Sequence, residues 1–431
     1  MEADDASGTG EVVAHFFRHE WARLVATLMR RYRGQSLDSV EDAVQGALLS
    51  ALSTWRRDGV PGNPSAWLFR AAGNRLLDQI RHQVIATKAA AEPPDARVQR
   101  AEPSEPPLGG DIVDDALRVL FLCCDERLPA QTQLVLALRF CCGFGTTEIA
   151  ARLFISTENA QKILERGRER LQEAWQGLGD LSDTALEPER LRARLPVVQN
   201  VVYLVFNEGY SSRQEDEPIR RELCEEALRL ARFLVEHPDT GAPSSWALLA
   251  LLELHTARLA ARLDGQGQLL LLEEQDRSCW DRAGIARGME CLWRSGRGEE
   301  FSRYHAEAAI LAEHCMAPSF EGTRWGEIVS LYEILEQQQP SPFHTLNRAI
   351  ALAEWQGPQA GLDLLRLVTP PPWLAGYYLW IGAEGELCRR LASFDEAAPL
   401  LARAQELAPT RAERQIFARK AQRCADQDAS R

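Results

Sequence analysis

The chain has 431 residues, more than one ordinary helical core holds, so two or three domains are expected. Its apolar content of 45% is that of a globular protein, and no apolar run reaches the about 18 residues that span a bilayer. The net charge of −13 argues against a protein that binds nucleic acid over its whole surface. Residues 1–11 are polar and acidic, unlike a secretory signal, so we expect a disordered N-terminus and a cytoplasmic protein.

The ten cysteines do not indicate a metal site. They include no C-x-x-C pair, and no Cys/His group has zinc spacing. His15 and His19 are four residues apart on a predicted helix, but the glutamate of an H-E-x-x-H motif is missing. We therefore expect reduced core cysteines and no cofactor.

The first predicted domain covers residues 12–86 and is helical. Across residues 40–55 the apolar residues recur every three or four positions, which is the spacing of one helix face. Turn residues at 59–64 interrupt this pattern, and Ser65 is expected to cap a second helix over residues 66–81.

The helix around residues 38–52 has a polar face as well as an apolar one. One interpretation is a solvated helix start, because acidic residues there complement the helix dipole. The other is a docking face for a basic partner. The polar face is expected to carry Asp38, Glu41, Asp42 and Gln45.

The helix after the break has the residue types of a nucleic-acid contact. Arg70, Asn74 and Arg81 lie close to one face of a helix. Arginine neutralises phosphate, asparagine reads base edges, and an exposed Trp67 would stack on an unpaired base. The alternative for Trp67 is a place in the core.

Residues 87–110, rich in Pro, Ala and Glu, are expected to form a flexible linker to a second helical domain, residues 111–176. Residues 145–171 of this domain have the pattern of a helix-turn-helix, with residues 146–154 as the supporting helix and Ser156 as the cap of the recognition helix. The candidate DNA contacts are Thr157, Asn159, Lys162, Arg166 and Arg168. For each of them the alternative is an ordinary solvent-exposed surface residue.

Residues 177–431 are predicted to be helical throughout. Residues 381–409 carry small and large residues at the packing positions of a tetratricopeptide repeat, which indicates stacked helix pairs. A cluster upstream has two interpretations. It is either an internal ion-pair knot or docking site, which we favour, or a catalytic acid pair for sugar chemistry. Its residues are Asp276, Arg277, Trp280 and Asp281.

The order of these motifs resembles the extracytoplasmic-function group of sigma-70 RNA polymerase sigma factors. Residues 38–51 match the family's region for the polymerase β′ clamp helices, residues 63–81 the segment that captures the melted −10 element, and residues 134–171 the −35-binding domain. Gly73 and His82 stand where the family often has arginine, so promoter strength or sequence is expected to differ.

The resemblance implies two groups of contact residues beyond the helix-turn-helix. Those for core polymerase are Asp38, Glu41, Asp42, Gln45, Leu48 and Leu49. Those for the −10 element are Asn63, Trp67, Arg70, Asn74, Arg75 and Arg81.

Motifs in the third region resemble the long, tetratricopeptide-like C-terminal extension of one sigma-factor subgroup, whose members generally lack a conventional anti-sigma partner. The motifs lie at residues 207–211, 274–281, 341–342 and 347–349.

The sequence therefore predicts an all-α protein with a sigma region 2 domain, a linker, a region 4 helix-turn-helix domain and a helical extension. The expected partners are core RNA polymerase, through the β′ clamp helices and the β flap, and promoter DNA. The extension is expected to modulate activity, and a regulatory protein partner there stays open. No enzymatic activity and no membrane contact are expected. The alternatives are a helix-turn-helix repressor with a helical sensor domain, and a helical enzyme with a regulatory N-terminal half.

Overall fold

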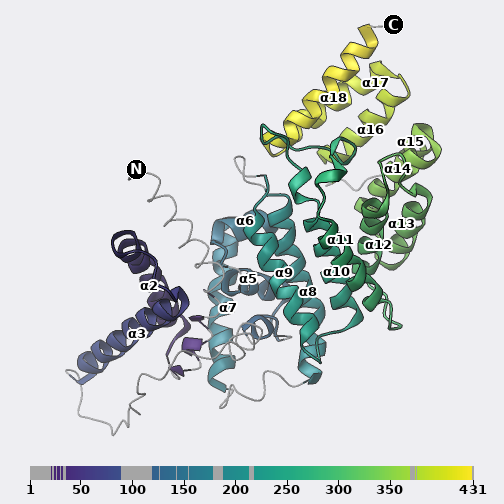
Figure 1. Ribbon diagram of the computed structural model, residues 1–431. Helices are drawn as coiled ribbons and strands as arrows, with labels where there is room; N and C mark the ends of the chain where they lie inside the picture. Colours follow the sequence, from purple (N-terminus) through teal and green to yellow (C-terminus); the bar gives the residue numbers. More distant parts are fainter. Residues whose placement is uncertain are drawn as a thin grey trace. The chain divides into compact units, whose positions relative to one another are not determined.

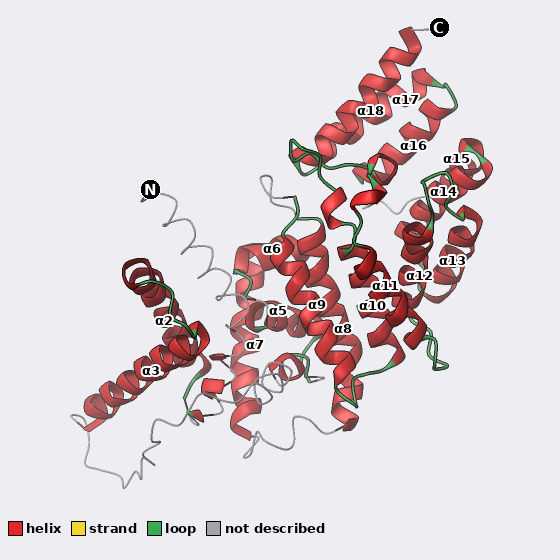
Figure 2. Cartoon of the chain, viewed as in Figure 1, coloured by secondary structure: helices red, strands yellow, loops and turns green. Residues whose placement is uncertain are grey.

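In the computed structural model, the regular secondary structure of the described residues is helical, which confirms the all-α class for those residues (Figures 1 and 2). Among these residues, the one pairing of extended backbone is an isolated bridge between Leu263 and Leu269. No helix in the described ranges is long and apolar enough to cross a bilayer. The described residues are 21, 24–25, 27–29, 31–32, 35–88, 119–125, 127–141, 143–153, 155–177, 188–212, 218–368, 374 and 376–429.

The chain divides into two compact units, residues 1–205 and residues 206–431. The predicted disordered segment 1–11, the pair His15 and His19, and the predicted linker from residue 89 onward lie outside the described residues. The helices of the first unit are α2 (Leu37–Asp58), α3 (Pro64–Lys88), α5 (Ala130–Phe140), α6 (Thr146–Leu153), α7 (Thr157–Gly177) and the first part of α8 (Pro188–Tyr210).

Helices α2 and α3 pack against one another and are joined by the predicted break. The hydroxyl of Ser36 accepts a hydrogen bond from the Ser39 amide and caps α2, and Gly59, at φ +82°, ends it. The cap predicted for α3 at Ser65 is wrong. Asn63 Oδ1 accepts from the Ala66 amide at 3.0 Å, because Pro64, with its fixed φ and no N–H, occupies the first helical position.

Helices α6 and α7 lie at the two helical segments predicted for the helix-turn-helix, and the assignment to that motif stays a prediction. Ser156 Oγ accepts from the Asn159 amide at 3.1 Å, so the predicted cap of the second helix is confirmed. Helix α5 packs against α7 at Gly167, where an added Cβ would lie 2.8 Å from Thr132 Cγ2. A small residue is required there for the two helices to approach.

A buried ion pair fixes the start of α8 in the first unit. Arg194 donates to the Asp125 carboxylate at 2.6 Å, and the two side chains are 7% and 6% exposed. Burial opposes the charge of Asp125, but hydrogen bonds from Arg127 and the charges of Arg194 and Arg127 outweigh it and hold the pKa of Asp125 at about 2.

We predict that Asp125→Asn lowers the free energy of unfolding of the first unit by about 3 kcal/mol at pH 7, because Arg194 is left buried without its counter-charge. Hydrogen exchange of peptides from α5 and α8 measures this change. Since the folded pKa of about 2 lies below the ordinary value, the difference is present above about pH 4 and shrinks as pH falls towards 2.

The matched control is Asp58→Asn, which breaks an ion pair with Arg57 in which both side chains are at least half exposed. Equal exchange in the two variants would contradict the role of the buried pair.

In the second unit, consecutive helices pack against one another along the chain (Figure 1). One such helix pair cannot bury its apolar face alone, so each depends on its neighbours. After the end of α8 the elements are α9 (Arg221–Glu236), α10 (Pro243–Thr256), η1 (Leu259–Ala261), η2 (Leu272–Glu274), η3 (Arg277–Cys279), α11 (Arg282–Ser295), α12 (Arg303–Met316), α13 (Trp325–Gln338), α14 (Pro342–Gln356), α15 (Pro358–Leu367), α16 (Tyr378–Arg390), α17 (Phe394–Leu407) and α18 (Arg411–Ala429).

The packing positions predicted for residues 381–409 are largely confirmed. Helices α16 and α17 form a pair in which Gly385, Cys388, Phe394 and Leu401 are buried. At Gly385 an added Cβ would lie 3.0 Å from Leu400 Cβ, so the small residue lets the two helices approach. The assignment to the tetratricopeptide family itself stays a prediction.

Candidate nucleic-acid interface

The residues predicted to bind polymerase on α2 do not share one solvent-facing side. Asp38, Asp42 and Leu49 are exposed, and Gln45 is half-buried. The expectation that Glu41 is exposed is wrong, because it lies in the apolar stripe formed by Leu37, Val40, Val44 and Leu48, and it is 3% exposed. Leu48 is also buried.

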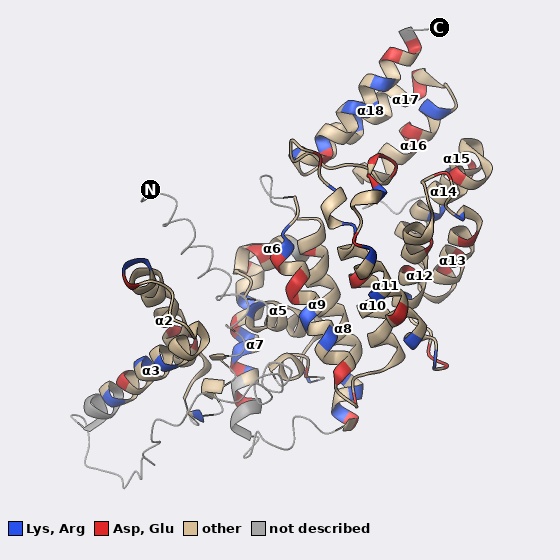
Figure 3. Cartoon of the chain, viewed as in Figure 1, with Lys and Arg blue, Asp and Glu red and all other residues tan. Residues whose placement is uncertain are grey.

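The predicted −10 residues lie on or beside an exposed part of α3. Asn63, Arg70, Asn74, Arg75 and Arg81 are exposed. Four of them make contacts within the protein, since Asn63 caps α3, Arg70 donates to the Ala66 carbonyl at 3.3 Å, Arg75 donates to Ser50 Oγ at 2.6 Å and Arg81 pairs with Asp78 at 3.0 Å. The basic residues of α3 are visible in Figure 3.

Trp67, predicted either to stack on a base or to join the core, is half-buried. Its ring meets Trp55 edge-to-face, with centroids 5.5 Å apart. Trp67 therefore packs on α2 with one part of its surface and leaves another part accessible.

The predicted −35 residues divide between two sides of α7. Asn159, Lys162 and Arg166 are exposed and, at 3.6 residues per turn, project from one side. Thr157 and Arg168 lie on another side, eleven residues apart. Only the first group therefore presents a continuous polar and basic surface to solvent.

Arg168 does not point to solvent with the others. It forms an ion pair and a hydrogen bond with Glu41 of α2, and its second terminal nitrogen lies 3.4 Å from Asp38 Oδ1. Its guanidinium also lies over the Phe140 ring, 5.6 Å from the centroid. One predicted −35 residue is thus bound to two predicted polymerase residues within the first unit.

A fourth charged residue, which the sequence did not indicate as functional, completes this contact. Arg139 of α5 lies 3.6 Å from Glu41 Oε1, and its guanidinium covers the buried ring of Trp21 at 5.6 Å. We call Glu41, Asp38, Arg168 and Arg139 the charge cluster. Arg139 gave no sequence signal because the helix-turn-helix pattern begins after it.

The charge cluster is costly to bury. Burial raises the pKa of the Glu41 carboxyl, an effect that the charges of Arg168 and Arg139 only partly offset. Burial likewise lowers the pKa of Arg139. Glu41 Oε1 and Arg168 Nε are buried without a hydrogen-bond partner. Because the desolvation cost is only partly compensated, the contact between α2 and α7 contributes less net stability than its short distances suggest.

The C-terminal cluster has structural partners rather than the predicted mutual ion pairs. Asp276 and Asp281 accept hydrogen bonds from the amides of Ser278 and Ala283, and so cap η3 and α11. Arg277 donates to the carbonyls of His314 and Ala317. The expected internal knot is therefore wrong, although a structural role for these residues is supported.

Trp280 is the buried centre of that region, 3% exposed. The guanidinium groups of Arg258 and Arg277 lie 5.1 and 4.7 Å from the centre of its ring. Arg258, which the sequence did not single out, also donates to the Gln275 side chain. Cation–π contacts therefore hold this loop against α10 and α12.

The motif at residues 207–211 also serves packing. At Gly209 an added Cβ would lie 2.7 Å from the Cys224 backbone nitrogen, so α8 and α9 approach only because no side chain is present. Tyr210 stacks with the Arg262 guanidinium, 3.8 Å from the ring centroid. These contacts belong to the second unit and support a packing role for Gly209 and Tyr210.

The titratable groups of the described residues do not form a metal site, because no three His, Cys, Asp or Glu side chains gather suitably. Of the described cysteines, Cys279 is exposed and the others are buried thiols. Burial raises the pKa of Cys224 to about 12, as expected for a core residue.

Comparison with known proteins relates both units to protein families. Residues 17–84 match the Sigma-70 region 2 family, and residues 194–296 match a family of unknown function, DUF6596. An uncharacterized protein of Rhizobium meliloti (strain 1021) is 36% identical over 395 residues, which cover 90% of either chain. The chain belongs to the family of that protein. No solved structure matches it.

The chain thus carries a sigma-70 region 2 domain that includes α2 and most of α3. That domain suggests a sigma factor role in transcription initiation, implies binding to core RNA polymerase, and implies a non-enzymatic role for residues 17–84. Neither matched range includes α6 and α7, so their identification as sigma region 4 stays a prediction. The range of unknown function includes Asp276–Asp281.

We predict that Glu41 and Arg168 are energetically coupled. In a double-mutant cycle with Glu41→Gln and Arg168→Gln, the coupling free energy should lie between about 0.5 and 3 kcal/mol, because the two side chains share a hydrogen bond and an ion pair. Hydrogen exchange of peptides from α7 is the measurement. The cycle of Asp42→Asn with Arg168→Gln is the control and should give additive effects. Additivity in both cycles would contradict the contact.

Proposed function

We propose that this protein is an extracytoplasmic-function-type sigma factor. It binds core RNA polymerase and directs promoter recognition at the −10 and −35 elements, and its C-terminal helical extension modulates this activity. The observation that carries the proposal is a sigma-70 region 2 domain in the same unit as a helix-turn-helix whose second helix exposes Asn159, Lys162 and Arg166. A cytoplasmic location follows from this role.

The proposed polymerase contact is the N-terminal part of α2. Asp38, Asp42 and Leu49 are exposed there and offer two carboxylates and an apolar group to the β′ clamp helices. Helix α3 would face the −10 strand, with Arg70 for phosphate and Asn74 for a base edge. The half-buried Trp67 leaves part of its indole for stacking.

The −35 duplex would be read by α7. Asn159, near the N-terminus of the recognition helix, is proposed to reach bases, while Lys162 and Arg166 neutralise phosphates. The helix-turn-helix domain would also meet the β flap. Because polymerase supplies most of the affinity, the protein needs only differential binding, which stabilises the melted promoter over the closed one.

We infer that the free protein is partly self-masked. In the charge cluster, Arg168 of the −35 helix binds Asp38 and Glu41 of the polymerase-binding helix, so neither surface is complete for its partner. Binding to polymerase would exchange these contacts for intermolecular ones.

The decisive experiment is run-off transcription with core polymerase on a promoter library. We expect promoter-specific transcripts, and we expect Lys162→Ala and Arg166→Ala each to weaken −35-dependent initiation. Each should also reduce the slope of log initiation against log salt by about 1, because one phosphate contact is lost.

The control is Arg282→Ala, which removes an exposed charge of the second unit. Equal initiation by all these proteins would contradict the assignment of α7. Operator binding and repression without polymerase would instead support the repressor alternative.

Self-masking predicts that Glu41→Gln raises the affinity of the free protein for a −35 duplex severalfold. The substitution keeps the side-chain shape but leaves two arginines facing one another, which favours opening. Fluorescence anisotropy without polymerase measures the affinity. Asp42→Asn removes the same charge from the exposed side of α2 and serves as the control. If the two variants bind alike, the masking contact is unimportant.

A further inference from the structure

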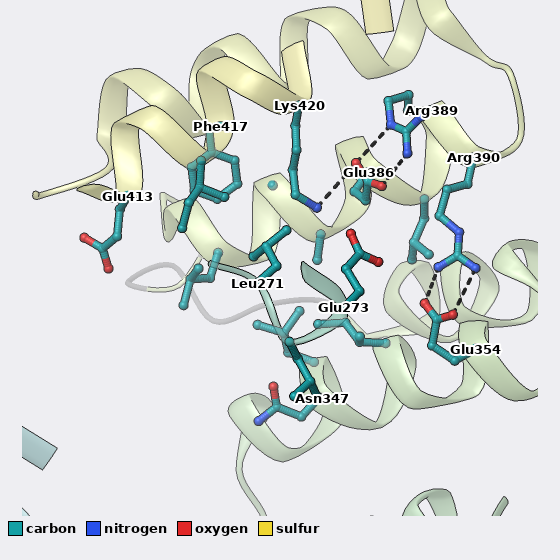
Figure 4. A pocket seen from close by; sticks show the side chains of 18 of the residues that line it. Leu271, Glu273, Asn347, Glu354, Glu386, Arg389, Arg390, Glu413, Phe417 and Lys420 are labelled. Carbon is teal, nitrogen blue, oxygen red and sulfur yellow. Dashed lines mark hydrogen bonds and ion pairs between the residues drawn. The ribbon is translucent and has the colours of Figure 1, made fainter. Parts of the chain in front are cut away.

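The second unit contains a pocket of about 580 Å³, within the range of small-molecule sites. It opens between α14, α16, α18 and the loop that carries Leu271 and Glu273 (Figure 4). Because these walls come from segments far apart in the sequence, an occupant would contact four elements at once.

The pocket surface is largely apolar. Leu346, Leu387 and Phe417 are buried in its wall, whereas Ile350 and Leu379 are 41% and 39% exposed. Phe417 forms the wall because α16 has a glycine opposite it, where a Cβ at Gly382 would lie 2.1 Å from Phe417 Cε1. An apolar occupant would remove the exposed part of this surface from water.

The charges at the pocket favour a cation over an anion. Each basic side chain there already has a carboxylate, since Arg389 and Lys420 bind Glu386, and Arg390 binds Glu354 (Figure 4). Arg389 also donates to Gln427. An anionic ligand would therefore have to compete with an existing ion pair.

The carboxylates are in excess. Glu273 is exposed, points towards the space between α14 and α16 in Figure 4, and forms no ion pair with any described residue. Asn347, also exposed at the pocket, offers an amide oxygen as a further acceptor. The side chain at the pocket that lacks an ion pair with a described residue is thus a carboxylate, which carries a negative charge and accepts hydrogen bonds.

We propose that this pocket binds a small organic cation: an apolar body, which covers Ile350, Leu379 and Phe417, joined to an ammonium or guanidinium group that pairs with Glu273. Such a ligand would bridge the Leu271–Glu273 loop to α14, α16 and α18. The pocket would then be the place at which a chemical signal reaches the C-terminal extension. Binding itself does not depend on the proposed sigma factor role.

The test uses three probes with one apolar body: 4-phenylbutylamine, 4-phenylbutanol and 4-phenylbutyrate. Isothermal titration calorimetry on the full chain should show one site that prefers the amine to the alcohol by about tenfold, the size of a charge-assisted hydrogen bond. The carboxylate should bind most weakly. Equal binding of amine and alcohol, or tighter binding of the carboxylate, would overturn the proposal.

Two exposed positions test the location without disturbing the core. Glu273→Gln should abolish the preference for the amine, and Leu379→Asn should weaken all three probes. The matched controls are Glu299→Gln and Leu367→Asn, an exposed carboxylate and an 81%-exposed leucine that do not line the pocket. If the pocket variants bind as their controls do, the site lies elsewhere and the proposal fails.

Discussion

The first unit depends on a single buried carboxylate in an otherwise apolar helix face. Glu41 occupies a core position of α2, where a charged group is tolerated only if opposite charges meet it. Arg168 and Arg139 supply those charges from α7 and α5. The position of α7 against α2 is therefore tied to an electrostatic requirement of one residue. The same requirement explains why Arg168 is turned away from the exposed Lys162 and Arg166 on the same helix.

Local order was predictable from the sequence, because it depends on short-range rules. The spacing of apolar residues predicted α2, the turn residues predicted where it ends, and Ser156 predicted where α7 begins. Ser65 failed as a cap because the proline before it already begins the helix. The prediction that Glu41 is exposed failed because, in the sequence, one polar residue within an apolar stripe cannot be told from a residue at the edge of that stripe. Its partner Arg168 lies 127 residues away, and no local pattern indicates the contact.

The C-terminal cluster shows a different limit. The sequence groups these charged residues, but it does not show whether the carboxylates pair with Arg277 or accept from the backbone. Asp276 and Asp281 each stand before a helical turn and accept backbone amides as caps, while Arg277 donates to the carbonyls of His314 and Ala317. Arg258, from α10's C-terminal side, completes the packing around Trp280. The sequence does not indicate that Arg258 is the second cation, beside Arg277, that contacts the Trp280 ring.

The cap at Asn63 has a consequence for recognition that goes beyond helix stability. Its side-chain oxygen accepts from the Ala66 amide, which fixes the orientation of the side-chain amide. In the proposed promoter contact the NH₂ group would donate to phosphate oxygens or to acceptor atoms on a base, and the oxygen keeps one lone pair for a further donor. The cap at the start of α3 thereby fixes the orientation in which these groups meet a partner.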